Sequence, residues 1–421
     1  MKEIKTQKIA NCQVRVPGSK SYTHRMLIAA ALANGVSTLK NALVSEDTQF
    51  TMEALRQMGI QIDINRDEVR VDGKGGCIEP CDAPIYLGNS GTSMRLLTGV
   101  AALGKGIYTL TGNDRMQMRP IKDLLDALQQ MGIKARSVKN NGCPPVEVTG
   151  AAINAEQVDI NCQNSSQYLS ALLLMAPGTS QGLEIRVVGG PPVSRPYVDL
   201  TVKLMETFGI RLKREGYQKF KVPGGQPYRA GKYIVETDCS QAAYFWGAAA
   251  ISGVEIKVAG IQTDSAQGDV RFVNLLQQMG CRVSRESNSI GVTGGPLHAI
   301  EADLADMPDQ VPTLAVVAAF AEGKTVIKNV AHLESKESDR LSATVAELNK
   351  MGIDAAGSPN ALMIKGGKPK GAIIDTYNDH RIAMSFAMAG LNVPGVCIRN
   401  ESCVEKSFPN FWQVFEGLYP S

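Results

Sequence analysis

The sequence predicts a mixed α/β protein made of two lobes, each with three copies of one unit of about 70 residues. Two helix patterns recur along the chain with the same period, and short strand-like runs follow them. A recurring period of this length indicates one supersecondary unit that is repeated along the chain. A chain of 421 residues is also too long for one ordinary core, which favours two domains.

The first helix pattern is amphipathic and ends at a glycine, as in EALRQMGIQIDI and DALQQMGIKARS. Apolar residues recur at helical spacing, a glycine suited to a helix C-cap follows, and a strand-like run comes next. The glycines that end the five clear copies are about 70 to 77 residues apart: Gly59, Gly132, Gly209, Gly280 and Gly352. A weaker sixth copy, FWQVFEGLYP, contains Gly417.

The second helix pattern is small and apolar nearly all round, as in SYTHRMLIAAALANG and SGTSMRLLTGVAALG, and this predicts buried helices. These segments begin with Ser, Thr, Asn, Asp or Gly, and in three of them Arg25, Arg95 or Arg381 follows. Polar N-caps explain the first residues but not the arginines, because a cation is unfavourable at the positive end of a helix. Backbone N–H groups together with arginine therefore predict anion-binding sites at these helix starts.

Composition limits the classes of function. The chain has 44 Lys and Arg against 41 Asp and Glu, a net charge of +3, which argues against nucleic acid or a membrane surface as a partner. Neither a signal-peptide core nor an apolar run of membrane-spanning length is evident, so we expect a cytoplasmic protein. The nine cysteines are scattered, and the close pair Cys77 and Cys81 has no nearby histidine, so neither a disulfide framework nor a metal site is predicted.

Nine short polar segments carry the candidate functional residues: VPGSKSYTHR, LGNSGTSMR, RMQMRPI, NSSQYLS, PPVSRPYVD, ADMPDQVPT, HLESKESDR, YNDHRIAMS and CVEKSFP. Taken singly, each has a purely structural interpretation. Asp309 is a possible helix N-cap, Glu337 a possible surface carboxylate, and Arg119 a possible solvated cation. Their common association with helix starts favours an anion-binding function for the set.

Together these segments resemble the 5-enolpyruvylshikimate-3-phosphate synthase family, and the resemblance covers the chain end to end. Its most specific parts are LGNSGTSMR, SKESDRL and NDHRIAMS. The resemblance implies the inside-out α/β barrel of enolpyruvyl transferases, in which each lobe has buried helices inside and sheets outside. It also implies one lobe from residues 19–237 and another from 1–18 with 238–421, with the active site in the cleft between them.

The implied reaction transfers the enolpyruvyl group of phosphoenolpyruvate to the 5-hydroxyl of shikimate 3-phosphate and releases phosphate. It proceeds by addition and elimination through a tetrahedral intermediate, in the shikimate pathway to chorismate and the aromatic amino acids. Such chemistry needs an acid/base group for carbon, another for oxygen, and cations around the substrate anions. The resemblance implies no cofactor and no metal, a monomer with two small-molecule substrates, and competition by glyphosate.

The resemblance also assigns residues. Lys20, Asp309 and Glu337 are implied as catalytic, with Glu337 the better candidate for protonating C3 of phosphoenolpyruvate. The implied phosphoenolpyruvate contacts are Lys20, Gly91, Arg119, Gln167, Arg340, Arg381 and Lys406. The implied shikimate 3-phosphate contacts are Lys20, Ser21, Arg25, Ser165, Ser166, Gln167, Ser194, Tyr197, Asp309 and Lys336. The sequence departs from the family at His332, where many relatives carry Asn, and at Leu96, where some carry Pro.

Two alternatives remain open at this point. The sister transferase, which acts on UDP-N-acetylglucosamine, uses a cysteine in a loop after the second unit, whereas TGNDRMQMRP has none. A non-catalytic protein that binds phosphorylated ligands is expected to have lost an acid/base residue, and this sequence retains all three. An assay for phosphate release from phosphoenolpyruvate that depends on shikimate 3-phosphate separates the three possibilities.

Overall fold

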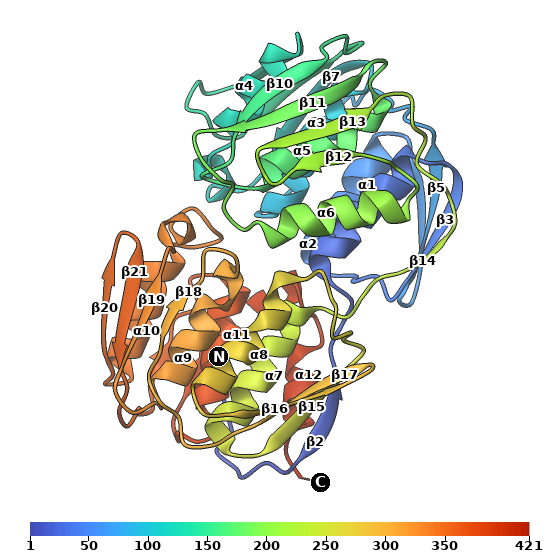
Figure 1. The fold of residues 1–421 in the computed structure, drawn as a ribbon. Coiled ribbons are helices and arrows are strands. Elements are labelled where there is room, and N and C mark those ends of the chain that lie inside the picture. Colours follow the sequence, from blue (N-terminus) through green and yellow to red (C-terminus); the bar gives the residue numbers. More distant parts are fainter. Residues whose placement is uncertain (421) are drawn as a thin grey trace. The chain divides into compact units, whose positions relative to one another are not determined.

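The computed structural model describes residues 1–420, and the chain forms two compact units (Figure 1). Gly18–Val235 form the inserted unit, and Met1–Pro17 with Glu236–Ser421 form the terminal unit. Each unit has its own core of buried apolar side chains.

The inserted unit contains three four-stranded sheets, in the strand orders β14-β3-β5-β4, β6-β7-β9-β8 and β10-β11-β13-β12. Its helices are α1 (Lys20–Leu32), α2 (Glu46–Gln57), α3 (Gly91–Ala102), α4 (Lys122–Gln130), α5 (Gln167–Met175) and α6 (Pro196–Thr207), with short 3-10 helices η1 (Met116–Met118) and η2 (Ala176–Gly178). Its strands are β3 (Asn34–Lys40), β4 (Gln61–Asn65), β5 (Glu68–Lys74), β6 (Ile85–Tyr86), β7 (Gly106–Thr111), β8 (Lys134–Ser137), β9 (Val146–Gly150), β10 (Gln157–Asn161), β11 (Gly182–Val188), β12 (Lys213–Glu215), β13 (Lys219–Pro223) and β14 (Lys232–Ile234).

The terminal unit contains two four-stranded sheets, β16-β17-β15-β2 and β18-β19-β21-β20, and one three-stranded sheet, β1-β23-β22. Its helices are α7 (Cys239–Ser252), α8 (Phe272–Gln278), α9 (Val311–Ala318), α10 (Arg340–Lys350), α11 (His380–Ala389) and α12 (Phe411–Glu416), with η3 (Gly268–Arg271), η4 (Pro308–Gln310), η5 (Ala331–Leu333) and η6 (Glu401–Lys406). Its strands are β1 (Lys2–Glu3), β2 (Cys12–Arg15), β15 (Glu255–Ala259), β16 (Arg282–Glu286), β17 (Ser289–Thr293), β18 (Glu301–Asp303), β19 (Lys324–Lys328), β20 (Asp354–Ser358), β21 (Ala361–Lys365), β22 (Ile373–Ile374) and β23 (Cys397–Ile398).

All six sheets follow one plan. One strand pairs in parallel with the strand that follows a buried helix, as β10 does with β11 in the register Val158↔Ile185. The second strand then pairs antiparallel with the next strand along the sheet, as β11 does with β13. In two of the sheets the parallel partner comes from a distant segment, because β14 pairs with β3 and β2 pairs with β15. The predicted mixed α/β repeat is therefore confirmed.

The six predicted buried helices are α1, α3, α5, α7, α9 and α11, and nearly all of their residues are buried. In each unit three of them pack against one another, α1, α3 and α5 in one and α7, α9 and α11 in the other. None of the six carries an acidic residue in its first turn, whereas α2, α4 and α6 do. The starts of α1, α3 and α5 thus keep their attraction for an external anion, whereas the carboxylates of Asp238 and Asp379 cap α7 and α11.

The five predicted glycine stops are also confirmed. Gly59, Gly132, Gly209, Gly280 and Gly352 have φ values of +86°, +82°, +87°, +111° and +76°, in the left-handed region that favours glycine. Gly417 also ends its helix as predicted, at the C-cap of α12, but its φ of −65° is right-handed. Its repeat is also the incomplete one, since β1 from the N-terminus supplies the third strand of a sheet that has only three.

Candidate functional site

Two arginines approach the start of α3 closely because residue 91 has no side chain. A methyl group on Gly91 would lie 2.4 Å from Nη2 of Arg119 and 2.6 Å from Nη1 of Arg95. Arg119 Nη1 donates to the carbonyl and side-chain oxygens of Asn89, at 2.9 and 3.0 Å. Arg95 Nη1 donates to Oε1 of Gln167 on α5 at 3.0 Å. The predicted residues Gly91, Arg119 and Gln167 therefore lie together, and Arg95 connects them.

Arg25 on α1 is a buried cation whose hydrogen-bond partners are all neutral. Its guanidinium donates to Oγ1 of Thr201 at 2.7 Å, to Oγ of Ser170 at 3.1 Å and to the carbonyl of Ser21 at 3.1 Å. Within residues 1–420 no carboxylate forms an ion pair with it, and burial lowers the pKa of Arg25 to about 10. A buried charge without a counterion is costly, so this position favours an anion such as a phosphate.

Neutral hydrogen-bonding groups gather where α5 and α6 begin. Ser165, Ser166 and Ser194 are all buried, and Ser166 Oγ donates to the carbonyl of Ser194 at 3.4 Å. Ser194 has φ +54°, a strained conformation for a residue with a side chain, and the N–H of Tyr197 donates to its carbonyl. Two predicted segments that are 28 residues apart thus meet at one place.

Lys20 is paired with a carboxylate that the sequence did not predict. Its Nζ lies 2.9 Å from Oδ2 of Asp47, and the two side chains are only 11% and 2% exposed. Asp47 lies in the first turn of α2, where an acidic residue is expected for the helix dipole alone. Because this role alone explains an acidic residue at position 47, the contact of Asp47 with Lys20 was not predicted.

In the terminal unit, Arg340 joins the two predicted acid/base carboxylates. Arg340 is buried and donates at 2.7 Å to each of Asp309, Glu337 and Asp379. Burial opposes the charge of Arg340, but these carboxylates outweigh burial and raise its pKa. Asp309 and Glu337 come from η4 and from the loop before α10, so the fold and not the sequence brings them together.

Asp309 forms ion pairs with two arginines, Arg340 and Arg381. Its Oδ2 accepts from Nη2 of Arg381 at 2.6 Å, and Arg381 also donates to the hydroxyl of Tyr244 at 3.0 Å. Burial favours the neutral carboxyl, but the guanidiniums of Arg381 and Arg340 outweigh burial and lower the pKa of Asp309. The N-cap interpretation of Asp309 is wrong, because Asp309 lies inside η4 and Gln310 occupies the N-cap of α9.

The other predicted residues of this unit lie in the same region. Lys336 is in the loop before α10, and its charge lowers the pKa of Asp309 further. Lys406 is buried at the end of η6, which packs against α11, the helix that carries Arg381. Burial, and then the charge of Lys336, lower the pKa of His332 to about 3, so His332 is neutral at physiological pH.

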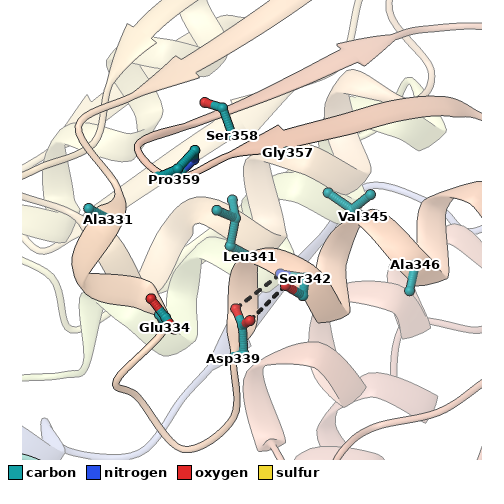
Figure 2. A pocket seen from close by; sticks show the side chains of 10 residues that line it. All are labelled: Ala331, Glu334, Asp339, Leu341, Ser342, Val345, Ala346, Gly357, Ser358 and Pro359. Atoms are coloured by element: carbon teal, nitrogen blue, oxygen red, sulfur yellow. Dashed lines mark hydrogen bonds between the residues drawn. The ribbon is translucent and has the colours of Figure 1, made fainter.

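A separate hollow of about 500 Å³ lies beside α10 (Figure 2). It is bordered on one side by Leu341 and Val345 and on the other by the β20–β21 turn. Asp339 caps α10 there, since its carboxylate accepts from the N–H and the hydroxyl of Ser342 at 3.1 and 2.6 Å. The residues that line this hollow all differ from the predicted substrate contacts, so we place the candidate site at Arg340 and not in the hollow.

The sequence did not predict several residues that contact the predicted site residues. These are Asp47 with Lys20, Tyr244 with Arg381, and Thr201 and Ser170 with Arg25. Polar residues within otherwise apolar helices were the available signal for Tyr244 and Ser170. Among the described residues 1–420, no cluster of three or more His, Cys, Asp or Glu side chains could hold a metal ion, and no helix is long and apolar enough to span a membrane.

Comparisons with known proteins agree along nearly the whole chain. The family described as EPSP synthase (3-phosphoshikimate 1-carboxyvinyltransferase) matches residues 4–415. A 3-phosphoshikimate 1-carboxyvinyltransferase of Syntrophobacter fumaroxidans is 44% identical over 96% of this chain and 96% of its own length, and one of Nitrosomonas europaea is 42% identical over 97% and 96%.

Solved structures give the same result. EPSP synthase from Acinetobacter baumannii is 30% identical over 99% of this chain and 97% of its own, with a TM-score of 0.82. The enolpyruvyl transferase NikO from Streptomyces tendae, at 21% identity, 99% and 96% coverage and a TM-score of 0.81, shares the fold. The match over residues 4–415 and these identities show that the chain belongs to the EPSP synthase family.

Proposed function

We propose that this chain transfers the enolpyruvyl group of phosphoenolpyruvate to the 5-hydroxyl of shikimate 3-phosphate and releases phosphate. The family relationship makes it a transferase of the shikimate pathway, and it favours this activity over the sister UDP-N-acetylglucosamine transferase and over a non-catalytic binding protein. The observation that carries the residue assignments is Arg340, which holds Asp309 and Glu337 within 2.7 Å of one guanidinium.

Phosphoenolpyruvate carries a carboxylate and a phosphate, and several cations are proposed to bind it. Planar guanidiniums suit such oxygens, because each presents two parallel N–H donors. The proposed contacts are Lys20, Gly91, Arg119, Gln167, Arg340, Arg381 and Lys406. The close approach of Arg119 to Gly91 supports this set, since only a glycine lets the guanidiniums of Arg119 and Arg95 come so near the start of α3.

Shikimate 3-phosphate is proposed to bind at the starts of α1, α5 and α6. Arg25, which forms no ion pair within residues 1–420, is suited to the phosphate of this substrate, and buried hydroxyls are suited to the substrate's remaining oxygens. The proposed contacts are Lys20, Ser21, Arg25, Ser165, Ser166, Gln167, Ser194, Tyr197, Asp309 and Lys336. Because the two sets draw on both units, we propose that the inserted and terminal units act on the substrates together.

The proposed chemistry follows from the charge states. Asp309 is held ionised by Arg340 and Arg381, so it suits the base that takes the proton of the 5-hydroxyl while that oxygen bonds to C2 of phosphoenolpyruvate. Glu337 is proposed to give a proton to C3 and later to take one back, as the bond from C2 to the phosphate oxygen breaks. Lys20 is proposed to contact both substrates and to offset the negative charge that develops.

The test is release of phosphate from phosphoenolpyruvate by the purified protein, with and without shikimate 3-phosphate. We expect release only with both, and none when UDP-N-acetylglucosamine replaces shikimate 3-phosphate. Release with the nucleotide sugar instead would contradict the substrate, and ligand binding without turnover would contradict the activity. We also propose that the protein acts as a cytoplasmic monomer, which sedimentation equilibrium and cell fractionation can check.

A further inference from the structure

Glu347 on α10 is a buried carboxylate that the reaction described above does not use. Its side chain is 0% exposed, and it accepts three hydrogen bonds. One comes from Nζ of Lys350 on the same helix, at 2.8 Å. The other two come from the segment before α11, from the N–H of Asp375 at 3.1 Å and from the hydroxyl of Tyr377 at 2.7 Å. Hydrogen bonds to a charged acceptor are strong, so Glu347 holds this segment against α10.

The segment that Glu347 holds has a strained backbone. Tyr377 and Asn378 have φ values of +53° and +54°, in the left-handed region, although both carry side chains. Such a conformation persists only where neighbouring contacts enforce it. The contacts here are the hydroxyl of Tyr377 on Glu347 and the amide of Asn378, whose Oδ1 accepts from Nδ2 of Asn400 at 3.1 Å. Because strain of this kind gathers at functional sites, the position of the next residue is of interest.

The next residue is Asp379, a fully buried carboxylate of the candidate site. Its Oδ2 accepts from Nε of Arg340 at 2.7 Å, and its Oδ1 accepts from Nη2 of Arg340 at 3.3 Å. Its Oδ1 also accepts from the backbone N–H of Arg381 at 2.9 Å, which fixes the start of α11. A shift of Asp379 therefore displaces both the guanidinium of Arg340 and the first turn of α11.

A shift of Arg340 also moves the proposed acid/base pair. Its Nη1 donates to Asp309 and its Nη2 donates to Glu337, each at 2.7 Å. Hydrogen bonds and one short backbone segment thus connect Glu347 to both proton-transfer groups, and all of these contacts lie within the terminal unit. Displacement of a reacting group by about 1 Å can lower a rate about 10²-fold, so the connection can affect turnover.

We propose that Glu347 and Tyr377 are positioning residues of the acid/base site, which act by holding Asp379 against Arg340. The inference rests on the proposed function, because it requires the carboxylates bound to Arg340 to transfer protons. Loss of the Tyr377 hydroxyl lets the left-handed segment relax and lets Asp379 shift. Turnover with phosphoenolpyruvate should then decrease, whereas binding of shikimate 3-phosphate, whose phosphate is assigned to Arg25, should change little.

The experiment compares Tyr377→Phe with the wild type. The substitution removes only the hydroxyl of a side chain that is 45% exposed, so the fold should survive. We expect kcat/KM for phosphoenolpyruvate to fall about 10- to 100-fold, the effect of losing a hydrogen bond to a charged group and displacing a positioned one. Calorimetric titration with shikimate 3-phosphate alone should give a nearly unchanged Kd. Tyr419→Phe is the matched control, because it removes a hydroxyl that donates to the carbonyl of Lys5 in the same unit, and it should leave both values unaltered.

Glu347→Gln tests whether the two residues act as a pair. The neutral amide keeps the shape of the buried side chain, but its nitrogen cannot accept a hydrogen bond, so kcat/KM for phosphoenolpyruvate should fall here too. Because the hydroxyl acts through Glu347, Tyr377→Phe should cost less in the Glu347→Gln background than in the wild type.

Equal fold-losses from Tyr377→Phe in the two backgrounds would overturn the inference. Wild-type kinetics of Tyr377→Phe with only a lower melting temperature would also overturn it, because the hydroxyl would then have a purely structural role. If Glu347→Gln does not fold, the kinetics of Tyr377→Phe alone decide. Absence of phosphate release by the wild type would instead contradict the proposed function.

Discussion

At the scale of single residues, Gly91 matters because of the side chain it lacks. Gly91→Ala would place a methyl group within 2.7 Å of two guanidiniums, and overpacking of this kind costs about 1–3 kcal/mol. We therefore expect a KM for phosphoenolpyruvate raised by about 5- to 150-fold, and glyphosate inhibition that weakens with it. Steady-state kinetics with and without glyphosate measure both.

The control for this substitution is Gly231→Ala in the same unit. Its new methyl group would lie no closer than 3.5 Å to the nearest side chain, and the backbone of Gly231 is not in the left-handed region. We expect unchanged kinetics. Equal glyphosate inhibition of the wild type and Gly91→Ala would show that Gly91 does not face the ligand.

Asp309 and Glu337 are a second test at the residue scale. With Asp309→Asn, Arg340 keeps Glu337 and Asp379 as partners, so the fold should survive while kcat falls by about 10²–10⁴-fold, the usual contribution of a positioned general base. Glu337→Gln should show a similar fall and should slow exchange of solvent deuterium into C3 of phosphoenolpyruvate. Mass spectrometry of the recovered substrate measures that exchange.

Asp339→Asn is the matched control for this pair. Asp339 lies in the same loop but caps α10, so its substitution should change stability by about 1 kcal/mol at most and leave kcat unaltered. Wild-type turnover and exchange in Glu337→Gln would remove Glu337 from the mechanism and leave Lys20 as the proton donor.

At the scale of helices and strands, much of the fold could be predicted because each repeat contains short sequence patterns that indicate its helices and their ends. A glycine after an amphipathic helix and a small apolar helix are signals within 15 residues or so, and all six predicted glycines end their helices, five of them with a left-handed backbone. A local pattern does not reveal that the sixth repeat takes the third strand of its sheet, β1, from the other end of the chain.

Side-chain partners were harder to predict, because the two residues of a pair come from distant parts of the chain. Arg25 meets Thr201 across 176 residues, and Arg381 meets Tyr244 across 137. Such contacts depend on how repeats pack, so a polar residue in an apolar helix can indicate that it has a partner but not which residue that partner is.

The glycine stops permit a stability prediction for these elements. Gly132→Ala places a side chain at φ +82° with no atom within 4 Å to collide with, so only the backbone conformation is strained. The expected loss of unfolding free energy is about 1–2 kcal/mol. Gly417→Ala, at φ −65°, should lose much less. Urea denaturation of the two variants measures both values, and equal losses would show that the left-handed conformation is not the cause.

At the scale of the whole molecule, the two units repeat one architecture but carry different parts of the proposed chemistry. The inserted unit has Arg25, Arg119 and the buried serines, which suit binding of phosphate and hydroxyl oxygens. The terminal unit has Asp309 and Glu337 on Arg340, which suit proton transfer. Under the proposed function, residues of both units act on the two substrates.

This division predicts a change of shape when ligands bind. Lys20 and Arg340 already have carboxylate partners in their own units, so repulsion between cations is a weak reason for the units to stay apart. The stronger reason to expect a change follows from the proposed function, in which residues of both units bind the same two ligands. We expect small-angle X-ray scattering to show a smaller radius of gyration with shikimate 3-phosphate and glyphosate than without ligands, and inorganic phosphate at equal ionic strength to have little effect. In Arg381→Lys the same decrease should need more glyphosate, because a bidentate contact is lost. An unchanged radius of gyration in the wild type at saturating ligand would contradict the prediction that binding draws the two units together.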